Sequence, residues 1–316
     1  MTWTPPLGNV WTREELLSRG VHPRVLASSE YVRVLPGRYA LSAVQVPLAE
    51  LAGCLAREVL PGAVVSHATA AELLGWPLPR RVRLESTGVL HCRVPAGDGR
   101  RAGPTVRVHR RAPRRMRRVG GVPVAGVAET LCDLAPSLTH DELVVCMDHI
   151  VGPAGSGFVA SVDELSRLLA DADGLQGVKK VRAALPDVRE KVESPQETAL
   201  RLALARFGFP EPTINLPIWA PGCRSPYRLD LSYPDLRIAI EYDGDWHRTD
   251  RVRFQRDRRK DDVLHEYGWR VVRVTSADLA RPDELIARLE HLGVPRAVRA
   301  SRAARASRAA GARRSA

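Results

Sequence analysis

Cysteine is scarce in this sequence, and no pair of cysteines has the spacing of a metal or redox site. The five cysteines are scattered over 316 residues without a CxxC pair. Such an odd, scattered set argues against a disulfide framework or a zinc site and fits the reducing cytoplasm, where we expect the protein. Long apolar runs are lacking as well, and the N-terminus has no basic segment followed by an apolar core. We therefore expect no membrane span and no secretory signal.

Lysine is rare too, so arginine carries nearly all of the positive charge. The chain has four lysines and a net charge of +12. Seven arginines and no acid follow Pro295, and without this tail the net charge is about +5 (12 − 7). Residues 109–118 hold six more arginines and no acid. Such clusters favour a nucleic acid or another polyanion as partner; the alternative interpretation is a solvated loop and a disordered tail.

The length exceeds one ordinary hydrophobic core, and we divide the chain into five segments. The predicted fold class is α/β (α+β), because helical and strand-like patterns are mixed along the chain. The segments are a winged-helix-like unit at 1–45, an α/β domain at 46–151, a helical connector at 152–190, a mixed sheet flanked by helices at 191–295, and a disordered basic tail at 296–316.

The first segment has the pattern of a helix, a turn, a second short helix and a hairpin. Thr12 and Glu15 make a capping box, and Gly20 ends the first helix. Residues 31–42 alternate around Pro36-Gly37, as the strands of a hairpin do. This order is typical of a winged DNA-binding unit, and small helical caps share it.

The second segment predicts four helices and two strands. Ser66 is the expected N-cap of the second helix. We interpret His67 as a capping or core residue, because a single histidine beside a helix start seldom has another role. The helices are expected at 48–60, 66–76, 127–135 and 139–151, and the strands at 81–86 and 105–111.

The fourth segment begins with a strong helix signal, in which Ser194 is the N-cap, Pro195 the first helical position and Glu197 the third. Strand and helix patterns follow in an order that predicts a small mixed sheet. Strands are expected at 213–220, 226–234, 236–244 and 268–275, and helices at 194–209, 250–268 and 282–293.

Two of these strands contain or lead into acidic residues. Asp230 alternates with Leu229 and Leu231, so the two leucines should share one face of their strand and Asp230 the other. Glu241 and Asp243 share a face of the next strand. Because a short Tyr-Pro-Asp turn joins the strands, we expect an antiparallel hairpin in which Asp230 and Glu241 are neighbours.

Two neighbouring carboxylates repel each other unless a positive charge lies between them. Their oxygens suit Mg²⁺ or Mn²⁺, ions that activate water and polarise a phosphodiester. His247 would then move a proton, Glu197 would add a third acid or orient water, and the phosphate would be held by Arg256, Arg259 and Lys260. The alternative is a buried ion network between acids and arginines, with Glu197 only a capping residue and Asp243-Gly244 only a turn.

Five motifs of this segment have a familiar order: SPQE (194–197), RLDL (228–231), IAIEYDGDWH (238–247), RDRRKDDVL (256–264) and GWRVVRV (268–274). The segment resembles the very-short-patch-repair (Vsr)-like branch of the PD-(D/E)xK nuclease superfamily. The resemblance implies a restriction-endonuclease-like sheet that cuts nucleic acid with Mg²⁺ held on Asp230 and Glu241. The chain departs from the superfamily pattern at Asp243, where that pattern has lysine. In this branch acids and histidine replace the lysine, so Asp243 and His247 are the implied substitutes.

The front half, through residues 11–40, 66–79 and 122–135, is similar to the antitoxin component of abortive-infection, type IV toxin–antitoxin systems. This resemblance implies a winged helix that binds promoter DNA and a second α/β domain. The implied DNA contacts lie near His22 and include Arg24, Arg33 and Arg38. A toxin is then a candidate partner.

We therefore predict an enzyme, a Mg²⁺- or Mn²⁺-dependent DNA endonuclease that an N-terminal DNA-binding region delivers to its substrate in repair, restriction or defence. A scaffold has no need of acids and a histidine gathered at the ends of apolar strands. The alternatives are a non-catalytic DNA-binding transcriptional regulator or antitoxin with a degenerate nuclease-like domain, and an interaction module that neutralises a partner. A homodimer is a further candidate assembly, since many nucleases that cut both strands work in pairs.

Overall fold

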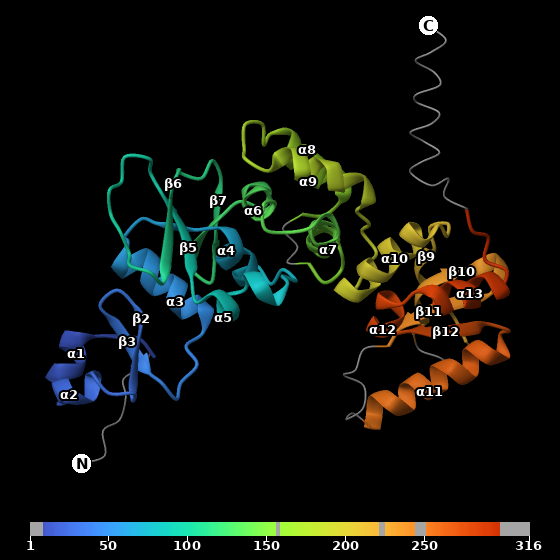
Figure 1. The fold of residues 1–316 in the computed structure, drawn as a ribbon, viewed down its shortest axis with the longest axis horizontal. Coiled ribbons are helices and arrows are strands. Elements are labelled where there is room, and N and C mark those ends of the chain that lie inside the picture. Colours follow the sequence, from blue (N-terminus) through green and yellow to red (C-terminus); the bar gives the residue numbers. More distant parts are fainter. Residues whose placement is uncertain (1–8, 156–158, 221–224, 244–250, 298–316) are drawn as a thin grey trace, which may run out of the picture. The chain divides into compact units, whose positions relative to one another are not determined.

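The computed structural model describes residues 9–155, 159–220, 225–243 and 251–297 (Figure 1). The chain divides into two units, Met1–Glu190 and Lys191–Ala316. Helices and strands are mixed in both units, so the predicted α/β fold class is confirmed. Among the helices in these ranges, none combines the length and the apolar character that crossing a bilayer requires.

The first unit begins with a small sheet and two short helices. Glu15 N donates to Thr12 Oγ1 over 3.0 Å, so the predicted capping box forms. The predicted hairpin also forms, and Gly37 in its turn has a φ of +68°, a region that glycine enters without steric cost. The elements are β1 (Trp11–Thr12), α1 (Arg13–Ser18), α2 (Pro23–Leu26), β2 (Tyr31–Leu35) and β3 (Arg38–Leu41), with the strand order β1-β3-β2.

The next part of this unit is a five-stranded mixed sheet with the order β6-β5-β4-β8-β7. Its strands are β4 (Val64–Val65), β5 (Leu90–Val94), β6 (Val106–Arg110), β7 (Met116–Val119) and β8 (Val122–Ala125). Leu90, Cys92 and Val94 alternate along β5 and pack into a core with Leu51 and Leu55. Those two leucines come from α3 (Leu48–Cys54) and the π-helical turn η1 (Leu55–Val59), and α4 (His67–Leu73) also contacts β5.

The strand predicted at 81–86 is wrong, because this stretch is helical. It forms the 3₁₀ turn η2 (Arg80–Val82) and the short helix α5 (Leu84–Thr87). The Glu72 carboxylate accepts a hydrogen bond from Leu84 N over 2.7 Å, and the Leu78 carbonyl accepts one from Arg83 Nε over 2.7 Å. These two bonds hold the start of α5, and no strand in the described part of the sheet pairs with this stretch.

Helices complete the first unit. These are α6 (Val127–Leu134), α7 (His140–Val151), α8 (Val162–Ala170) and α9 (Val178–Ala184), followed by the 3₁₀ turn η3 (Leu185–Asp187). Residues 159–190 are helical, as predicted, and they pack within this unit: α8 contacts α6, and α9 contacts α6 and α7. Leu165, Leu169 and Val181 are buried in these contacts.

The second unit is a four-stranded mixed sheet between helices (Figure 1). The strand order is β12-β11-β10-β9, with β11 and β12 parallel and the other pairs antiparallel. The main core joins the sheet to α10 and α13, and a smaller cluster that includes Leu264 joins its other face to α11. The elements are α10 (Pro195–Phe207), β9 (Thr213–Ile218), β10 (Tyr227–Tyr233), the 3₁₀ turn η4 (Pro234–Leu236), β11 (Ile238–Tyr242), α11 (Arg251–Glu266), β12 (Arg270–Val274), α12 (Ser276–Ala280) and α13 (Asp283–His291).

Candidate functional site

The predicted pairing of Asp230 with Glu241 is present. β10 and β11 are antiparallel, and their register aligns Leu231 with Ile240. Asp230 N donates to Glu241 Oε1 over 3.3 Å, and Tyr242 N donates to Asp230 Oδ2 over 3.1 Å. The two carboxylates therefore lie side by side on adjacent strands, each fixed by a backbone amide of the opposite strand.

The side-chain alternation around Asp230 differs from the prediction. Leu229 packs with Ala239 and Leu264, whereas Leu231 packs in the main core with Ile240. The two leucines thus lie on opposite faces of the sheet, and the prediction that they share one face is wrong. The cause is an irregularity opposite Asp230, where Asn215 of β9 has a φ of +49°. Strict alternation by two holds only for regular strands.

Glu197 is held at the start of α10 in a closed hydrogen-bond network. Its side chain is 6% exposed, and Ser194 caps the helix by accepting from Glu197 N over 3.2 Å. Oε1 accepts from Ser194 Oγ over 2.8 Å, and Oε2 accepts from Asn215 Nδ2 over 3.0 Å and from Glu193 N over 3.1 Å. Burial, followed by the charge of Asp230, raises the pKa of this carboxyl. Glu197 thus donates its backbone N–H to the Ser194 cap, and its carboxylate lies within electrostatic range of Asp230.

Lys260 reaches the acid pair from α11. Its Nζ lies 2.5 Å from Glu241 Oε2, and both side chains are largely buried. Burial and the charge of Asp230 raise the pKa of Glu241 to about 7, although the ammonium of Lys260 acts in the opposite direction. The sequence prediction for Lys260 was that it holds the phosphate, and its contact with Glu241 was not foreseen. A useful signal was present in the sequence, since Lys260 is the one lysine after position 191.

The remaining predicted residues of this unit fall in three groups. Asp243 is half-buried just after the end of β11, where its backbone N donates to Val274 O over 2.8 Å. Arg259 is exposed on α11. His247 and the side chain of Arg256 lie outside the described residues. The structure therefore brings together Glu197, Asp230, Glu241 and Lys260 of the predicted set.

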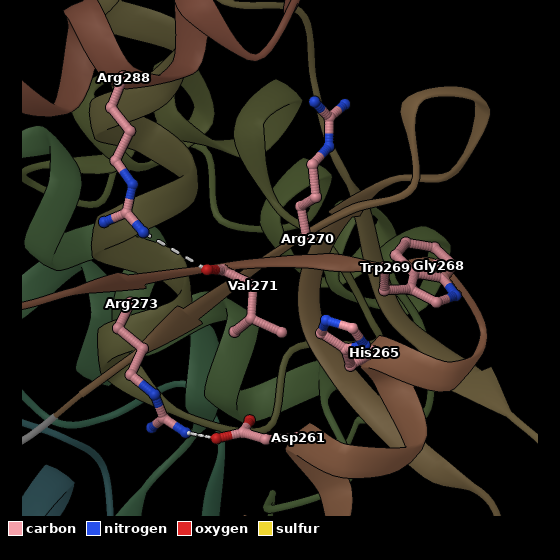
Figure 2. A pocket seen from close by; sticks show the side chains of 8 residues that line it. All are labelled: Asp261, His265, Gly268, Trp269, Arg270, Val271, Arg273 and Arg288. Atoms are coloured by element: carbon pink, nitrogen blue, oxygen red, sulfur yellow. Dashed lines mark hydrogen bonds and ion pairs between the residues drawn. The ribbon is translucent and has the colours of Figure 1, made fainter.

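A basic pocket lies beside the edge strand β12 (Figure 2). Arg273, which lines it, is the register partner of Glu241 and bonds Asp261 over 2.5 Å. Arg288 donates to the carbonyl of Val271 over 3.5 Å. The pocket has a volume of about 600 Å³, and its lining residues are Asp261, His265, Gly268, Trp269, Arg270, Val271, Arg273 and Arg288. Its three arginines suit an anionic ligand, and sequence reasoning did not find them.

The predicted DNA-contacting arginines of the first unit differ in their surroundings. Arg24 on α2 and Arg33 on β2 are exposed. Arg38 on β3 is half-buried and pairs with Glu58 through an Nε–Oε2 distance of 3.1 Å. Arg24 and Arg33 are thus available to a polyanion, while Arg38 already has an anionic partner.

Sequence reasoning also missed a group of three histidines in the first unit. His67, His91 and His109 come from three elements, and one nitrogen of each ring lies within 4.8 Å of one nitrogen of the other two. His67 does not cap α4, because Ser66 occupies the N-cap position. The capping part of its interpretation is therefore wrong, whereas its half-buried ring packs against the other two histidines. Only the tertiary structure brings the three rings together, since they are 18 or more residues apart in the chain.

The fold and the site define a two-unit α/β protein with a paired-carboxylate site on β10 and β11. Two proteins of Mycobacterium tuberculosis are similar to it, "Uncharacterized protein MT2308" of strain CDC 1551 / Oshkosh and "Uncharacterized protein Rv2248" of strain ATCC 25618 / H37Rv. Each is 31% identical over 258 residues, which cover 79% of this chain and 89% of the relative. The chain belongs to the family of these mycobacterial proteins. No protein-family model matches it.

Proposed function

We propose that the second unit is a Mg²⁺-dependent DNA endonuclease and that the first unit contributes DNA binding, in repair, restriction or defence. The observation that supports this most strongly is the contact between Asp230 and Glu241 on adjacent strands, with Lys260 beside them. The three charged side chains meet at a place that is largely shielded from water, and they come from β10, β11 and α11.

The carboxylates fit a small divalent cation. Burial and mutual repulsion hold the pKa of Glu241 at about 7, so a second positive charge beside the pair would relieve an electrostatic cost. The donors are hard oxygens, which favour Mg²⁺ or Mn²⁺ over softer metals. When bound on Asp230 and Glu241, such an ion would polarise the phosphodiester and lower the pKa of a coordinated water.

The other residues of the site have roles that follow from their contacts. Lys260 supplies an ammonium group that can balance negative charge on the reacting phosphate. In the superfamily pattern, this role belongs to a lysine two positions after the acid that corresponds to Glu241. Glu197 is fixed by Asn215 and Ser194, so it can orient a water molecule without losing its own hydrogen bonds. Arg270, Arg273 and Arg288 would contact the DNA backbone along β12, because arginine binds phosphate oxygens in a planar, bidentate manner.

A plasmid-nicking assay tests the proposal. The full-length protein is incubated with supercoiled DNA in Mg²⁺, in Mn²⁺ and in EDTA, beside Asp230→Asn and Glu241→Gln proteins whose circular dichroism matches the wild type. Asp235→Asn is the matched control, because this acid is exposed in the turn of the same hairpin. We expect metal-dependent nicking by the wild type and the control and none by the two site variants.

A non-catalytic DNA-binding regulator or antitoxin is the second candidate. The observation in its favour is that Lys260 already neutralises Glu241 without a metal, which a purely structural ion pair would also do. The same assay separates the two functions. DNA binding with no cleavage of supercoiled, mismatched, methylated or single-stranded DNA would favour the regulator and overturn the nuclease.

A further inference from the structure

The three histidines of the first unit form a half-buried cluster where one helix meets two strands. His67 begins α4, His91 lies on β5 and His109 lies on β6. The rings are stacked, with centroids 3.7 Å apart for His67 and His109 and 5.3 Å apart for the other two pairs. His91 Nδ1 and His109 Nε2 are 3.1 Å apart. Three imidazoles from three elements therefore meet at one place that solvent can reach.

The sheet explains why His91 and His109 meet. β5 and β6 are parallel, and their register aligns Arg93 with His109. Side chains two positions apart share a face, so His91, Arg93 and His109 lie on the same face of the pair. The alternate residues of β5, including Leu90 and Cys92, form the apolar core on the other face. His91 and His109 therefore lie on the opposite face of the sheet from the apolar core, on the face that α4 and α6 cover.

His67 is held in place by its backbone and by two oxygens. Its φ of +53° lies in the left-handed region, which costs a histidine free energy and requires the surroundings to enforce it. Ser66 Oγ lies 3.0 Å and Asp133 Oδ2 lies 3.2 Å from His67 Nδ1. Both oxygens face the same nitrogen, so Nε2 is left for another partner.

Asp133 is a buried carboxylate with a different partner for each oxygen. Oδ1 pairs with Arg93, and Oδ2 lies 3.2 Å from His67 Nδ1. Arg93 also pairs with Glu129 over 3.1 Å. Glu129 and Asp133 together carry one more negative charge than Arg93 balances. Exposed Arg107 supplies a further positive charge near the rings. The surroundings of the cluster are close to neutral.

We propose that His67, His91 and His109 bind a divalent transition-metal ion of the zinc class and that Asp133 orients His67 as a positioning residue. Three histidines with an open position are a common ligand set for Zn²⁺, and ligating histidines usually place their second nitrogen on a carboxylate. The 3.1 Å between His91 Nδ1 and His109 Nε2 is close to the ~3.3 Å that separates two nitrogens on a tetrahedral zinc ion. This site lies in the first unit and does not depend on the nuclease proposal.

Binding requires the rings to turn. The three ring planes are 16° to 28° from parallel in pairs, and nitrogen lone pairs lie in the ring planes, so the rings cannot all point at one ion while they stay stacked. A rotation of His67 about its side-chain bonds would bring Nε2 towards the other two nitrogens while Nδ1 stays near Asp133. The alternative occupant of the site is no ion at all, with the stacked rings bonded to each other.

The test is a titration of the full-length protein after chelator treatment. Zn²⁺ binding is measured by calorimetry, and Co²⁺ is used as a spectroscopic probe because tetrahedral nitrogen ligation gives intense visible bands. The titrations use a background that carries Asp230→Asn and Glu241→Gln, so that the acid pair cannot contribute. We expect one equivalent of Zn²⁺ that displaces Co²⁺.

Single variants assign the ligands. His67→Gln, His91→Gln and His109→Gln should each abolish the Co²⁺ bands while the thermal unfolding of the metal-free protein stays within a few degrees of the parent. Asp133→Asn should keep the bands and weaken binding about 10- to 100-fold. His291→Gln, which changes an exposed histidine on α13, is the matched control and should bind as the parent does.

Two outcomes would overturn the proposal. One is a folded parent protein that binds Zn²⁺ no more tightly than its His91→Gln variant. The other is Co²⁺ binding that survives in all folded histidine variants. Because three ligand variants are made, misfolding of one still leaves two that decide the question.

Discussion

Lys260 Nζ lies 2.5 Å from Glu241 Oε2, across the space between α11 and β11. The pair joins a helix to a strand through two residues that are 19 positions apart along the chain. In the proposed nuclease, this ammonium group would take the role of the lysine that the superfamily pattern has at the strand position of Asp243. The helix thus supplies the positive charge that the strand lacks.

Lys260 should therefore control both the rate of cleavage and its dependence on pH. Lys260→Gln should reduce the rate about 10²- to 10³-fold, as removal of one charge-stabilising donor usually does. Glu241, whose pKa is raised to about 7, is ionised above that value, so cleavage by the wild type should rise through pH 7. Without the ammonium the pKa rises further, and the acid limb should move to higher pH. A pH–rate profile checks this, with Lys260→Arg as the control that keeps the charge; an unmoved limb would contradict it.

Asn215 should stabilise the second unit through both its side chain and its backbone. Asn215→Ala removes the hydrogen bond to Glu197 and places alanine, which tolerates positive φ less well than asparagine, at this position. We therefore expect the free energy of unfolding to fall by about 1–3 kcal/mol. Asn215→Gly removes the same bond but tolerates that φ, and it should be about 1 kcal/mol more stable than the alanine variant. Urea unfolding measures both. Equal stability of the two variants would show that the backbone conformation contributes nothing.

Arg93 should be essential for the stability of the first unit. It is buried between two carboxylates, with Nη1 3.1 Å from Glu129 Oε1 and Nη2 bonded to Asp133. Arg93→Met would leave both acids buried without their cation, so we expect a loss of about 3–5 kcal/mol in urea unfolding. Arg107→Met changes an exposed arginine of the neighbouring strand and should stay within about 0.5 kcal/mol of the wild type. Similar losses for both variants would contradict this account.

The ionised carboxylate of Glu142 should stabilise the first unit at neutral pH, and this stabilisation should be lost in acid. Its hydrogen bonds to Arg81 lower the pKa of its carboxyl from 4.5 to about 2. A lowered folded-state pKa gives stability that is present above pH 4.5 and is lost as the pH falls towards 2. Glu142→Gln should therefore lower the melting temperature at pH 7 and have little effect at pH 2. Glu85→Gln, in an exposed pair with Arg80, should have little effect at either pH; a pH-independent loss for Glu142→Gln would exclude the ionic explanation.

The basic tail should add salt-sensitive affinity for DNA. Removal of residues 297–316 deletes six arginines and keeps Arg296, which pairs with Glu290. Each lost phosphate contact lowers the slope of log Kd against log salt concentration by about 0.9. Loss of all six arginines should therefore lower this slope by up to about 5. Fluorescence anisotropy with duplex DNA at several salt concentrations measures it. Unchanged binding at low salt would rule out this role.

Local signals in the sequence were sufficient for much of the fold and for the centre of the candidate site. The Thr12–Glu15 capping box, the Ser194 cap of α10 and the hairpin of β10 and β11 all depend on residues within one element or one turn. Asp230 and Glu241 could be paired from the sequence for the same reason, because a short turn fixes the register of its two strands. The stretch at 81–86 was misassigned since a short apolar alternation fits a strand and a helical turn equally well.

What the sequence by itself determined is therefore the set of elements and the contacts across short turns. Only the tertiary structure decided that Lys260 neutralises Glu241, that Asn215 breaks the alternation at Asp230 and bonds Glu197, and that three distant histidines share one place. The physical reason is that periodicity shows which face of an element is buried but not which element covers that face. Contacts between distant residues depend on how helices pack on a sheet, and that packing is a property of the whole chain.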